Sequence, residues 1–481
     1  MSDKITTHST DRIGKDSIGR LLWQFSIPAV IGMLVNAVYN IVDRIYLGLG
    51  VDSLAIAGVG IVMPIMMITQ AMSMLVGIGA NSLFSIRLGE GRSSEVEKIM
   101  GHAFALLFLL PLFSIIITFI FMDPILRNIL KVSDQIYPYA YSYFRIIMIG
   151  SIFAAMSPGI THFIRSDGHP KTSMLVQIIG ALMNIILDPI FIFVFDLGVA
   201  GAAYATIISQ FISFIFVIGY FNSKWTRLRF RLKNMRLDLK LTSHILALGF
   251  APFIMQFAIS LVGIVQNSRI LLYGGDEALT AMTILFSILT VVVMPLMGIG
   301  QGAQPIIGYN YGAKQYQRVK QCFKYAFFAN TSILTLGFII LQLAPGFCFS
   351  MFSKESGSLR DITIVIIRIC TALFPFLAIQ IMGGQFFQAI GKPIQGTILS
   401  LSRQILFFIP TILCLPILFG VIGLPQIYGV FWSFPISDAC SATLSTILVR
   451  REFKKMELYK DNTKIIYSTT EAHRGTQRFF L

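Results

Sequence analysis

Charge is scarce in this chain. Only 13% of its 481 residues are Asp, Glu, Lys or Arg, whereas 55% are hydrophobic and the mean hydropathy is +0.75. Soluble domains carry about 25% charged residues, so this composition excludes a water-soluble globular protein. The chain is therefore predicted to be an integral membrane protein.

The sequence also lacks the motifs of common catalytic, metal and nucleotide sites. Its five cysteines form no CxxC pair and their number is odd, which gives no pattern for a metal site or a set of disulfides. The six histidines show no spacing typical of metal ligands. No GxxxxGK[ST] P-loop occurs, so the chain carries no ATP motor of its own. We therefore expect neither an enzyme nor an organic cofactor.

Long apolar segments fill the chain instead. Segments of roughly 20 apolar residues, the length that crosses a bilayer, recur between polar loops. Twelve such spans are predicted, at about 22–47, 54–86, 99–122, 136–158, 172–195, 199–221, 243–273, 280–308, 322–346, 362–385, 396–418 and 427–449.

The net charge of +15 indicates how the chain is oriented in the membrane and does not indicate nucleic-acid binding. Most Lys and Arg residues lie in the two termini and in alternate loops, while the loops on the opposite side hold Arg127, Lys131, Lys354 and Arg360. In membrane proteins, loops rich in Lys and Arg generally remain in the cytoplasm. Residues 1–20 are polar and give no signal peptide. We expect a multi-pass protein of the inner or plasma membrane with both termini cytoplasmic.

The same apolar pattern occurs twice, at an offset of 223 residues. Arg145 corresponds to Arg368 at this offset, and the segment RSDGHP at 165–170 corresponds to QAIGKP at 388–393. Because each half has six spans, both halves enter the membrane from the same side, which predicts repeats related by an axis along the membrane normal. Internal repeats of this kind are typical of secondary transporters, whose site lies where the repeats meet.

The predicted fold is an all-α membrane protein with twelve transmembrane helices in two six-helix bundles, related by a pseudo-two-fold axis along the membrane normal. We expect the basic linker between the two bundles, at 223–242, to be a solvated tether. The C-terminal tail should be disordered from residue 459 on. A monomer should suffice, because one chain contains both halves. The expected parts are 1–20 as a cytoplasmic N-terminus, 21–222 as the N-terminal bundle, 223–242 as a basic cytoplasmic linker, 243–450 as the C-terminal bundle and 451–481 as a polar cytoplasmic tail.

Asp188 is the ionisable residue that most needs an explanation. It lies in an apolar segment, where a charge costs about 2.5–3.5 kcal/mol on insertion scales. Asn184 is four residues earlier and shares its helix face. Pro189 frees the carbonyl of Ile185 from helical hydrogen bonding. These oxygens predict a site for a hard cation or a proton, and the alternative is an Asp that bonds to a neighbouring helix.

A second polar stripe lies on the first span. Asn36, Tyr39, Asn40 and Asp43 occupy neighbouring helical positions on an otherwise apolar segment. Such a stripe should face the protein interior. A local pairing of Asp43 with Arg44 is the alternative, although adjacent residues on a helix diverge by about 100°.

Other polar residues in the spans leave structural and functional interpretations open. Asp438 is expected to pair with Arg368 or Arg403, as a structural ion pair or a coupling residue. Arg145 and Arg368 are equivalent in the two halves, which favours a shared structural role over coupling. Amides of the second half could line a substrate cavity, and the candidates are Gln256, Gln266, Asn267 and Gln385.

Several of these motifs together resemble the multidrug and toxic compound extrusion (MATE) family, nearest its MepA-like bacterial branch. The resemblance covers about residues 20–450. It rests on Pro28 with Asp43 in the first span, the Gly89-Glu-Gly loop, the RSDGHP turn, the segment from Asn184 to Pro189, and the sequence GVAGAA that begins at Gly198.

The resemblance implies a cation or proton site in the N-terminal bundle. Its residues would be Asp43 of the first helix, Asn184 and Asp188 of the fifth, and Thr206 of the sixth. Na⁺ would bind at the first three of these, and Na⁺ or H⁺ would be the coupling ion. Some members use acids in the seventh and tenth helices, but this chain has none in 243–273 or 362–385.

The predicted function is an ion-coupled antiporter that exports amphipathic, mostly cationic drugs by a rocking movement of the two bundles. The alternative is a lipid-linked oligosaccharide flippase of the same superfamily, which needs basic residues facing the cavity. Arg145, Arg269, Arg368 and Arg403 keep this alternative open.

Overall fold

The computed structural model describes residues 12–51, 53–226, 228–353 and 357–477, and these residues form helices without any strand. The first half consists of α2 (Ile18–Gly50), α3 (Ser53–Gly89), α4 (Ser93–Ile120), α5 (Met122–Pro124), the π-helix η1 (Ile125–Ile129), α6 (Tyr137–Ser166), α7 (Pro170–Pro189), the π-helix η2 (Ile190–Val194) and α8 (Gly198–Asn222). The second half follows the 3₁₀ turn η3 (Leu232–Met235) and consists of α9 (Leu239–Gly312), α10 (Tyr316–Leu343), α11 (Pro345–Ser350), α12 (Ser358–Cys370), η4 (Phe374–Phe376), α13 (Leu377–Ala389), α14 (Pro393–Leu401), the π-helix η5 (Ser402–Phe408), α15 (Ile409–Val421) and α16 (Gln426–Gln477).

Helix α9 is a hairpin of two spans rather than one straight rod. Gly275 breaks it with a φ of 67° and a ψ of −167°, a positive-φ conformation that favours glycine. Both ends of α9 reach the same end of α3, because Gly79 packs against Ile245 and Gly89 packs against Tyr309. The 74 residues of α9 therefore cross the membrane twice.

The described helices account for the twelve predicted spans. Nine of them are long and apolar enough to cross a membrane, and the pair α12 and α13, bent by 45° at a short break, makes a tenth. The second arm of α9 and the first part of α16 supply the other two. The all-α, two-bundle fold predicted from the sequence is confirmed.

Each bundle has its own hydrophobic core. Phe84, Leu107 and Phe163 join helices α3, α4 and α6 in the first half. Leu285 and Phe431 join α9 and α16 in the second half. The start of α2, although it precedes the first bundle in sequence, packs into a core of the second half together with Ile306 and Phe323.

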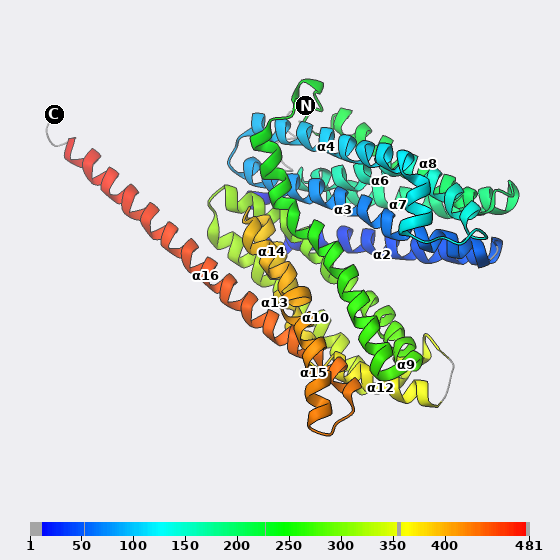
Figure 1. Cartoon of the computed structure of the whole chain (residues 1–481). Helices are drawn as coiled ribbons and strands as arrows, with labels where there is room; N and C mark the ends of the chain where they lie inside the picture. The colour runs from blue at the N-terminus through cyan, green and yellow to red at the C-terminus, as the bar shows by residue number, and fades with distance from the viewer. Residues whose placement is uncertain (1–11, 52, 227, 354–356, 478–481) are drawn as a thin grey trace.

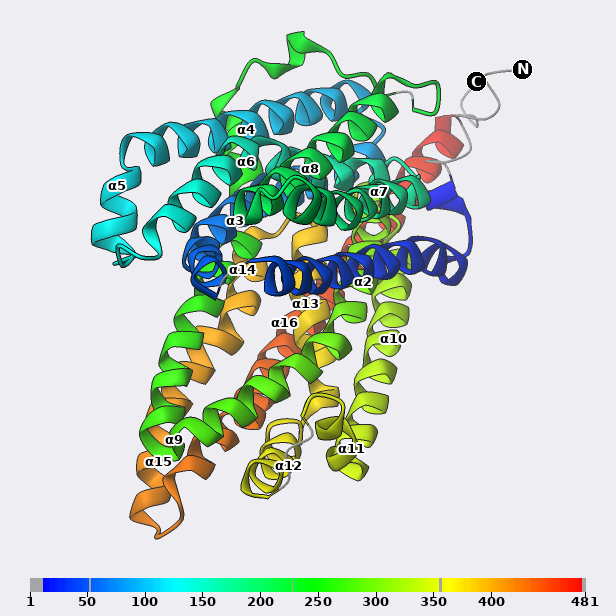
Figure 2. The same ribbon diagram turned by 90° about the vertical axis from the view of Figure 1, so that its right-hand side faces the viewer.

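The two bundles contact each other at the end that carries the linker. Backbones come close there, since a Cβ atom on Gly249 would lie 1.6 Å from the carbonyl oxygen of Leu75. Side-chain hydrogen bonds also cross the interface, among them those from Gln304 to Ser82 at 3.0 Å and from Arg165 to Gln301 at 2.9 Å. The bundles diverge toward their opposite ends (Figures 1 and 2). The structure is therefore open on the side away from the linker.

The linker is docked on the first bundle. His102 of α4 accepts a hydrogen bond of 2.9 Å from the backbone N–H of Asp238 through Nε2. Its Nδ1 lies 2.9 Å from the carbonyl oxygen of Lys98. A Cβ on Gly101 would collide with Asn234, which shows how closely η3 lies on α4. Most described residues of the linker are exposed, as expected of a solvated segment, but its charges did not indicate these contacts with α4.

The C-terminal tail is helical as far as Gln477, so the disorder predicted from residue 459 on is wrong for this part (Figure 1). Ion pairs of 2.5 Å from Lys392 to Glu452 and from Lys320 to Glu457 hold the helix to the second bundle as it leaves the spans. Extending an existing helix costs far less than nucleating one, and residues 459–474 contain neither Pro nor Gly.

Candidate ion-binding site

The fifth span of the first half brings an amide and a carboxylate together. Helix α7 begins with Pro170, which fits the first turn of a helix, and its last turn contains Asp188 and Pro189. The Nδ2 of Asn184 donates to Asp188 Oδ1 at 3.2 Å and lies 3.5 Å from Thr206 Oγ1 of α8. The Asn184 and Asp188 residues are 2% and 0% exposed. The three residues therefore form one buried polar cluster.

Asp43 of α2 completes the cluster from the opposite side. Its carboxyl lies close enough to that of Asp188 for the two charges to interact. The hydroxyls of Tyr39 and Tyr143 lie in the field of both carboxylates. Tyr143 of α6 is an addition to the predicted set, and no sequence pattern indicates it. Four helices thus converge on one acid pair.

Three oxygens of this acid cluster have no protein partner. Asp43 Oδ1, Asn184 Oδ1 and Asp188 Oδ2 are buried and accept no hydrogen bond from the described residues. Buried polar atoms in native proteins are almost always bonded, and two carboxylates side by side repel each other. A cation or a proton would satisfy these oxygens and relieve the repulsion. Hard monovalent and divalent cations favour such oxygen ligands.

The helix next to the acid cluster is irregular. Pro189 ends α7, and the chain continues as the π-helix η2. A proline removes one helical hydrogen bond, and π segments occur frequently at functional sites. The local sequence therefore both creates the irregularity and places it beside Asp188.

Two residues of the predicted stripe lie outside the acid cluster. Asn36 and Asn40 are exposed, and the amide of Asn40 donates to the carbonyl of Asn36 at 2.6 Å within α2. They lie on the part of α2 that precedes Asp43 and do not touch the acid pair. Of the supporting residues predicted on this helix, Tyr39 is the one brought close to the cluster.

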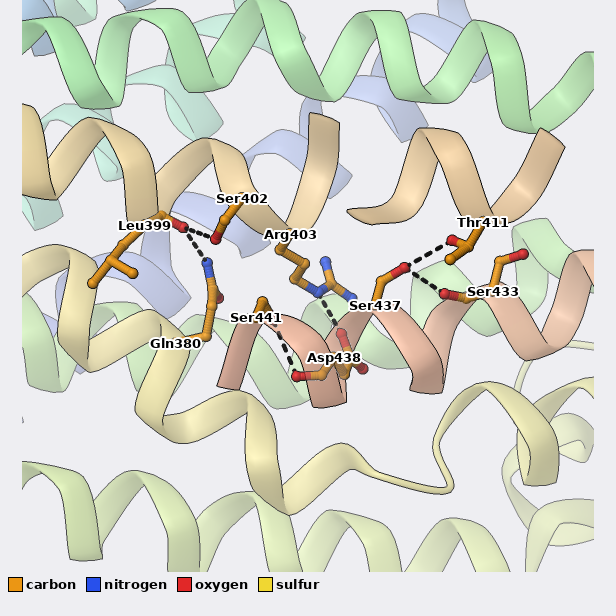
Figure 3. A network of polar contacts seen from close by, with 9 residues as sticks. All are labelled: Gln380, Leu399, Ser402, Arg403, Thr411, Ser433, Ser437, Asp438 and Ser441. Carbon is orange, nitrogen blue, oxygen red and sulfur yellow. Dashed lines mark hydrogen bonds and ion pairs between the residues drawn. The ribbon is translucent and has the colours of Figure 1, made fainter. Parts of the chain in front are cut away.

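The second half carries a different charged pair on its fifth and sixth spans. Asp438 of α16 is 2% exposed and receives a hydrogen bond of 2.5 Å from Arg403 Nε of η5 (Figure 3). Of the two partners predicted for Asp438, the structure therefore selects Arg403 over Arg368.

Comparisons with known proteins agree with this architecture. The sequence profile of the MatE family matches residues 28–190 and 252–413, one segment in each half. The chain belongs to the MatE family.

Its relatives in this family include two staphylococcal proteins. The "Multidrug export protein MepA" of Staphylococcus haemolyticus is 27% identical over 435 residues, which are 90% of this chain and 94% of that protein. The protein of the same name from Staphylococcus aureus strain N315 is 26% identical with the same coverage. The resemblance predicted from the motifs is confirmed.

A solved structure shows the same fold. It is described as the outward-facing conformation of a multidrug resistance MATE family transporter of the MOP superfamily, and it matches with a TM-score of 0.85 at 22% identity. The match covers 93% of this chain and 98% of that one. This MatE transporter therefore shares the fold over nearly its whole length.

The other predicted residues of this MatE transporter are dispersed. Arg145 and Arg368 are exposed, and neither forms an ion pair with any residue that the structure describes. The four amide candidates do not form one cluster in the described chain: Gln266 is buried, Asn267 is exposed, Gln256 is half-buried, and Gln385 lies against Gly300 and 3.7 Å from Met297 Sδ.

A further buried cluster lies in the turn between α6 and α7, in the RSDGHP segment. Tyr220 Oη of α8 donates to Asp167 Oδ2 at 2.7 Å, and His169 Nδ1 is 2.7 Å from the same hydroxyl. Burial raises the pKa of Asp167, while its hydrogen bonds with Thr226 and Tyr220 act in the opposite direction. The cluster fixes the turn that connects the fourth and fifth spans.

Tyr220→Phe is expected to lower the stability of the purified transporter. The change removes one donor from a carboxyl that is almost completely buried, which costs about 1–3 kcal/mol. The loss of this donor should also raise the pKa of Asp167 further. We expect a lower midpoint of thermal unfolding for the variant in detergent than for the wild type. An unchanged midpoint would show that this hydrogen bond does not hold the turn.

Proposed function

We propose that this chain is an ion-coupled antiporter that exports amphipathic, mostly cationic drugs. The observation that carries the proposal is the pair of the half-buried Asp43 and the buried Asp188, each with one buried oxygen that has no partner among the described residues. Intramembrane acids are expensive, and they mark ion paths and proton relays. The relatives named as multidrug export proteins support the drug class.

The mechanism couples the charge of the acid pair to the position of the bundles. Na⁺ or H⁺ enters from the open side and neutralises Asp43 and Asp188. The loss of repulsion changes the packing of α2 and α7 around Pro28 and Pro189. The bundles then rock about their contact, so that the open side closes and the linker side opens. A ligand shifts such an equilibrium only through differential affinity, so ion and drug favour opposite states.

The transporter belongs in the inner or plasma membrane with the linker and both termini in the cytoplasm. The positive loops support this orientation. The open side of the structure then faces outward, and one chain forms a complete monomeric transporter.

The flippase alternative is less well supported. It requires several basic residues around a large cavity for an anionic headgroup. Arg145 and Arg368 are exposed, and the charge of Arg403 is paired with that of Asp438. The acid cluster of the first bundle fits cationic cargo better.

Dye export from cells tests the proposal. Cells that produce the chain are loaded with ethidium, and Na⁺ and pH gradients are imposed separately. Export driven by one of the two gradients would support an antiporter and would name its ion. Absence of export from cells with well-inserted protein would contradict the drug function and favour the flippase.

A further inference from the structure

The last helix, α16, has a buried and an exposed face where it leaves the membrane. The stretch from Gln426 to Val449 is about 36 Å long at 1.5 Å per residue, which is enough to cross a hydrocarbon layer of about 30 Å. Beyond it, Met456 is 1% exposed and shares a hydrophobic core with Val449 and with Ile13 of the N-terminal segment. This end of α16 therefore lies on the side of the N-terminus, with one face against the second bundle.

The opposite face of this segment is cationic. At 100° per residue, four exposed side chains lie within about 140° of the helix circumference: Arg450, Arg451, Lys454 and Lys455. They form two pairs, each an arginine followed by a lysine four residues later. Like charges at this spacing on a helix repel each other. An anion bound between the members of a pair would relieve this repulsion.

The acids of the same segment are already paired with lysines from other elements. Glu452 Oε1 lies 2.5 Å from Lys392 Nζ, and Glu457 Oε1 lies 2.5 Å from Lys320 Nζ. Glu457 also lies in the field of Lys454. No carboxylate in the described part of the chain forms an ion pair with any of the four cations. The cationic face of α16 thus lacks a protein counterion of its own.

The cationic face continues a side of α16 that is turned toward lipid. The helices on which α16 packs, among them α13 and α15, belong to the second half, and α16 lies on the flank of this half that is remote from the first bundle (Figure 1). Trp432 and Ile447 lie on the same side of the helix as the cations and are 40% and 45% exposed. Side chains on a helix tilt toward its N-terminus, which for α16 is toward the bilayer. The four cations therefore reach back to the level of the lipid headgroups.

We propose that the face of α16 formed by Arg450, Arg451, Lys454 and Lys455 binds the headgroups of anionic phospholipids in the cytoplasmic leaflet. Clusters of Lys and Arg directly after a transmembrane helix attract anionic lipids. The planar guanidinium of arginine donates two parallel hydrogen bonds to a phosphate, and lysine adds a point charge. The inference rests on the cytoplasmic orientation proposed above, and it is independent of the cargo and of the coupling ion.

Native mass spectrometry of the purified full chain tests the proposal through the lipids that the protein retains. The protein in detergent is titrated with dioleoyl phosphatidylglycerol or with dioleoyl phosphatidylcholine, which have the same acyl chains and differ in headgroup charge. We expect the wild type to retain phosphatidylglycerol preferentially. Replacing all four cations of the face by glutamine should abolish this preference. Each single replacement should weaken phosphatidylglycerol binding about fivefold, the effect expected of one cation at an anionic surface.

A second pair of cations provides the matched control. Lys233→Gln with Arg236→Gln removes two exposed cations from the linker, which lies on α4 of the first bundle. This double variant should keep the preference for phosphatidylglycerol, whereas Arg450→Gln with Lys454→Gln should weaken it markedly. The thermal midpoint of each variant in lipid-free detergent reports whether it is folded, and the single variants decide the test if the fourfold variant is not.

Three results would overturn the proposal. The first is equal retention of the two lipids by the wild type. The second is an equal loss of preference in the α16 and linker double variants, because net charge alone would then account for the binding. The third is displacement of phosphatidylglycerol by an equal concentration of glycerol 3-phosphate, which would indicate a site for a soluble phosphate. The assay uses neither a dye nor an ion gradient, so a failure of the antiporter proposal would not change its result.

Discussion

Asp188→Asn is expected to reduce gradient-driven dye export to the level of cells that lack the protein. Asp188 is completely buried beside Asp43, and its Oδ2 has no hydrogen-bond partner in the described part of the chain. Asparagine keeps the shape of the side chain but can neither bind a proton nor carry the charge that attracts Na⁺. The equilibrium between the two states of the transporter then loses its dependence on the ion.

The folded protein should tolerate this change. Asparagine removes the repulsion between two neighbouring carboxylates, so the amount of variant in the membrane and its thermal midpoint should be at least those of the wild type. Asp276→Asn is the matched control, because Asp276 is an exposed acid at the break of α9. Undiminished gradient-driven export by Asp188→Asn would refute the coupling role of the acid pair.

Gly249→Val is expected to hold the bundles apart at the linker side and to abolish export. A Cβ there would lie 1.6 Å from the oxygen and 2.5 Å from the carbon of the Leu75 carbonyl. Both atoms belong to a helix backbone, which cannot yield as a side chain can. Overpacking of this kind costs about 1–3 kcal/mol, which shifts a two-state equilibrium about tenfold or more. The conformation in which the bundles are closed at the linker side should therefore be less populated in the variant.

Cysteine labelling can follow the shift directly. Ser82→Cys in a cysteine-free background reports access to the linker side, since Ser82 lies at the contact with Gln304. Labelling by a membrane-impermeant maleimide from the linker side should increase with Gly249→Val. Gly263→Val is the control, because a Cβ at Gly263 of the same helix meets no atom within 4 Å. Equal labelling in all three proteins would contradict the assigned gate.

Much of the fold could be predicted from the sequence because the bilayer imposes simple rules. Apolar length gives the spans, and the repeat offset gives the two bundles. The acid cluster was also predictable, since Asp43 and Asp188 are charges where charge is costly. The spacing of Asn184 and Asp188 placed them on one helix face, and the structure brings these residues together with Thr206.

The remaining features depend on tertiary contacts that no local pattern encodes. The approach of Gly249 to Leu75 joins residues from different bundles, and glycine is frequent in all the spans. The docking of the linker involves His102, whose role only the contact with Asp238 reveals. The prediction that amides such as Gln256 and Gln385 line one cavity rests on residue type alone. Residue type does not determine which face of a helix a side chain occupies.

Charge displacement by the purified transporter on a solid-supported membrane tests most directly whether the acid pair binds the coupling ion. A rapid jump in Na⁺ concentration or in pH should move the coupling ion into the acid pair of Asp43 and Asp188. We expect a transient current for one of the two jumps in the wild type and in Asp276→Asn, and none in Asp188→Asn. A current of undiminished size in Asp188→Asn would contradict this expectation.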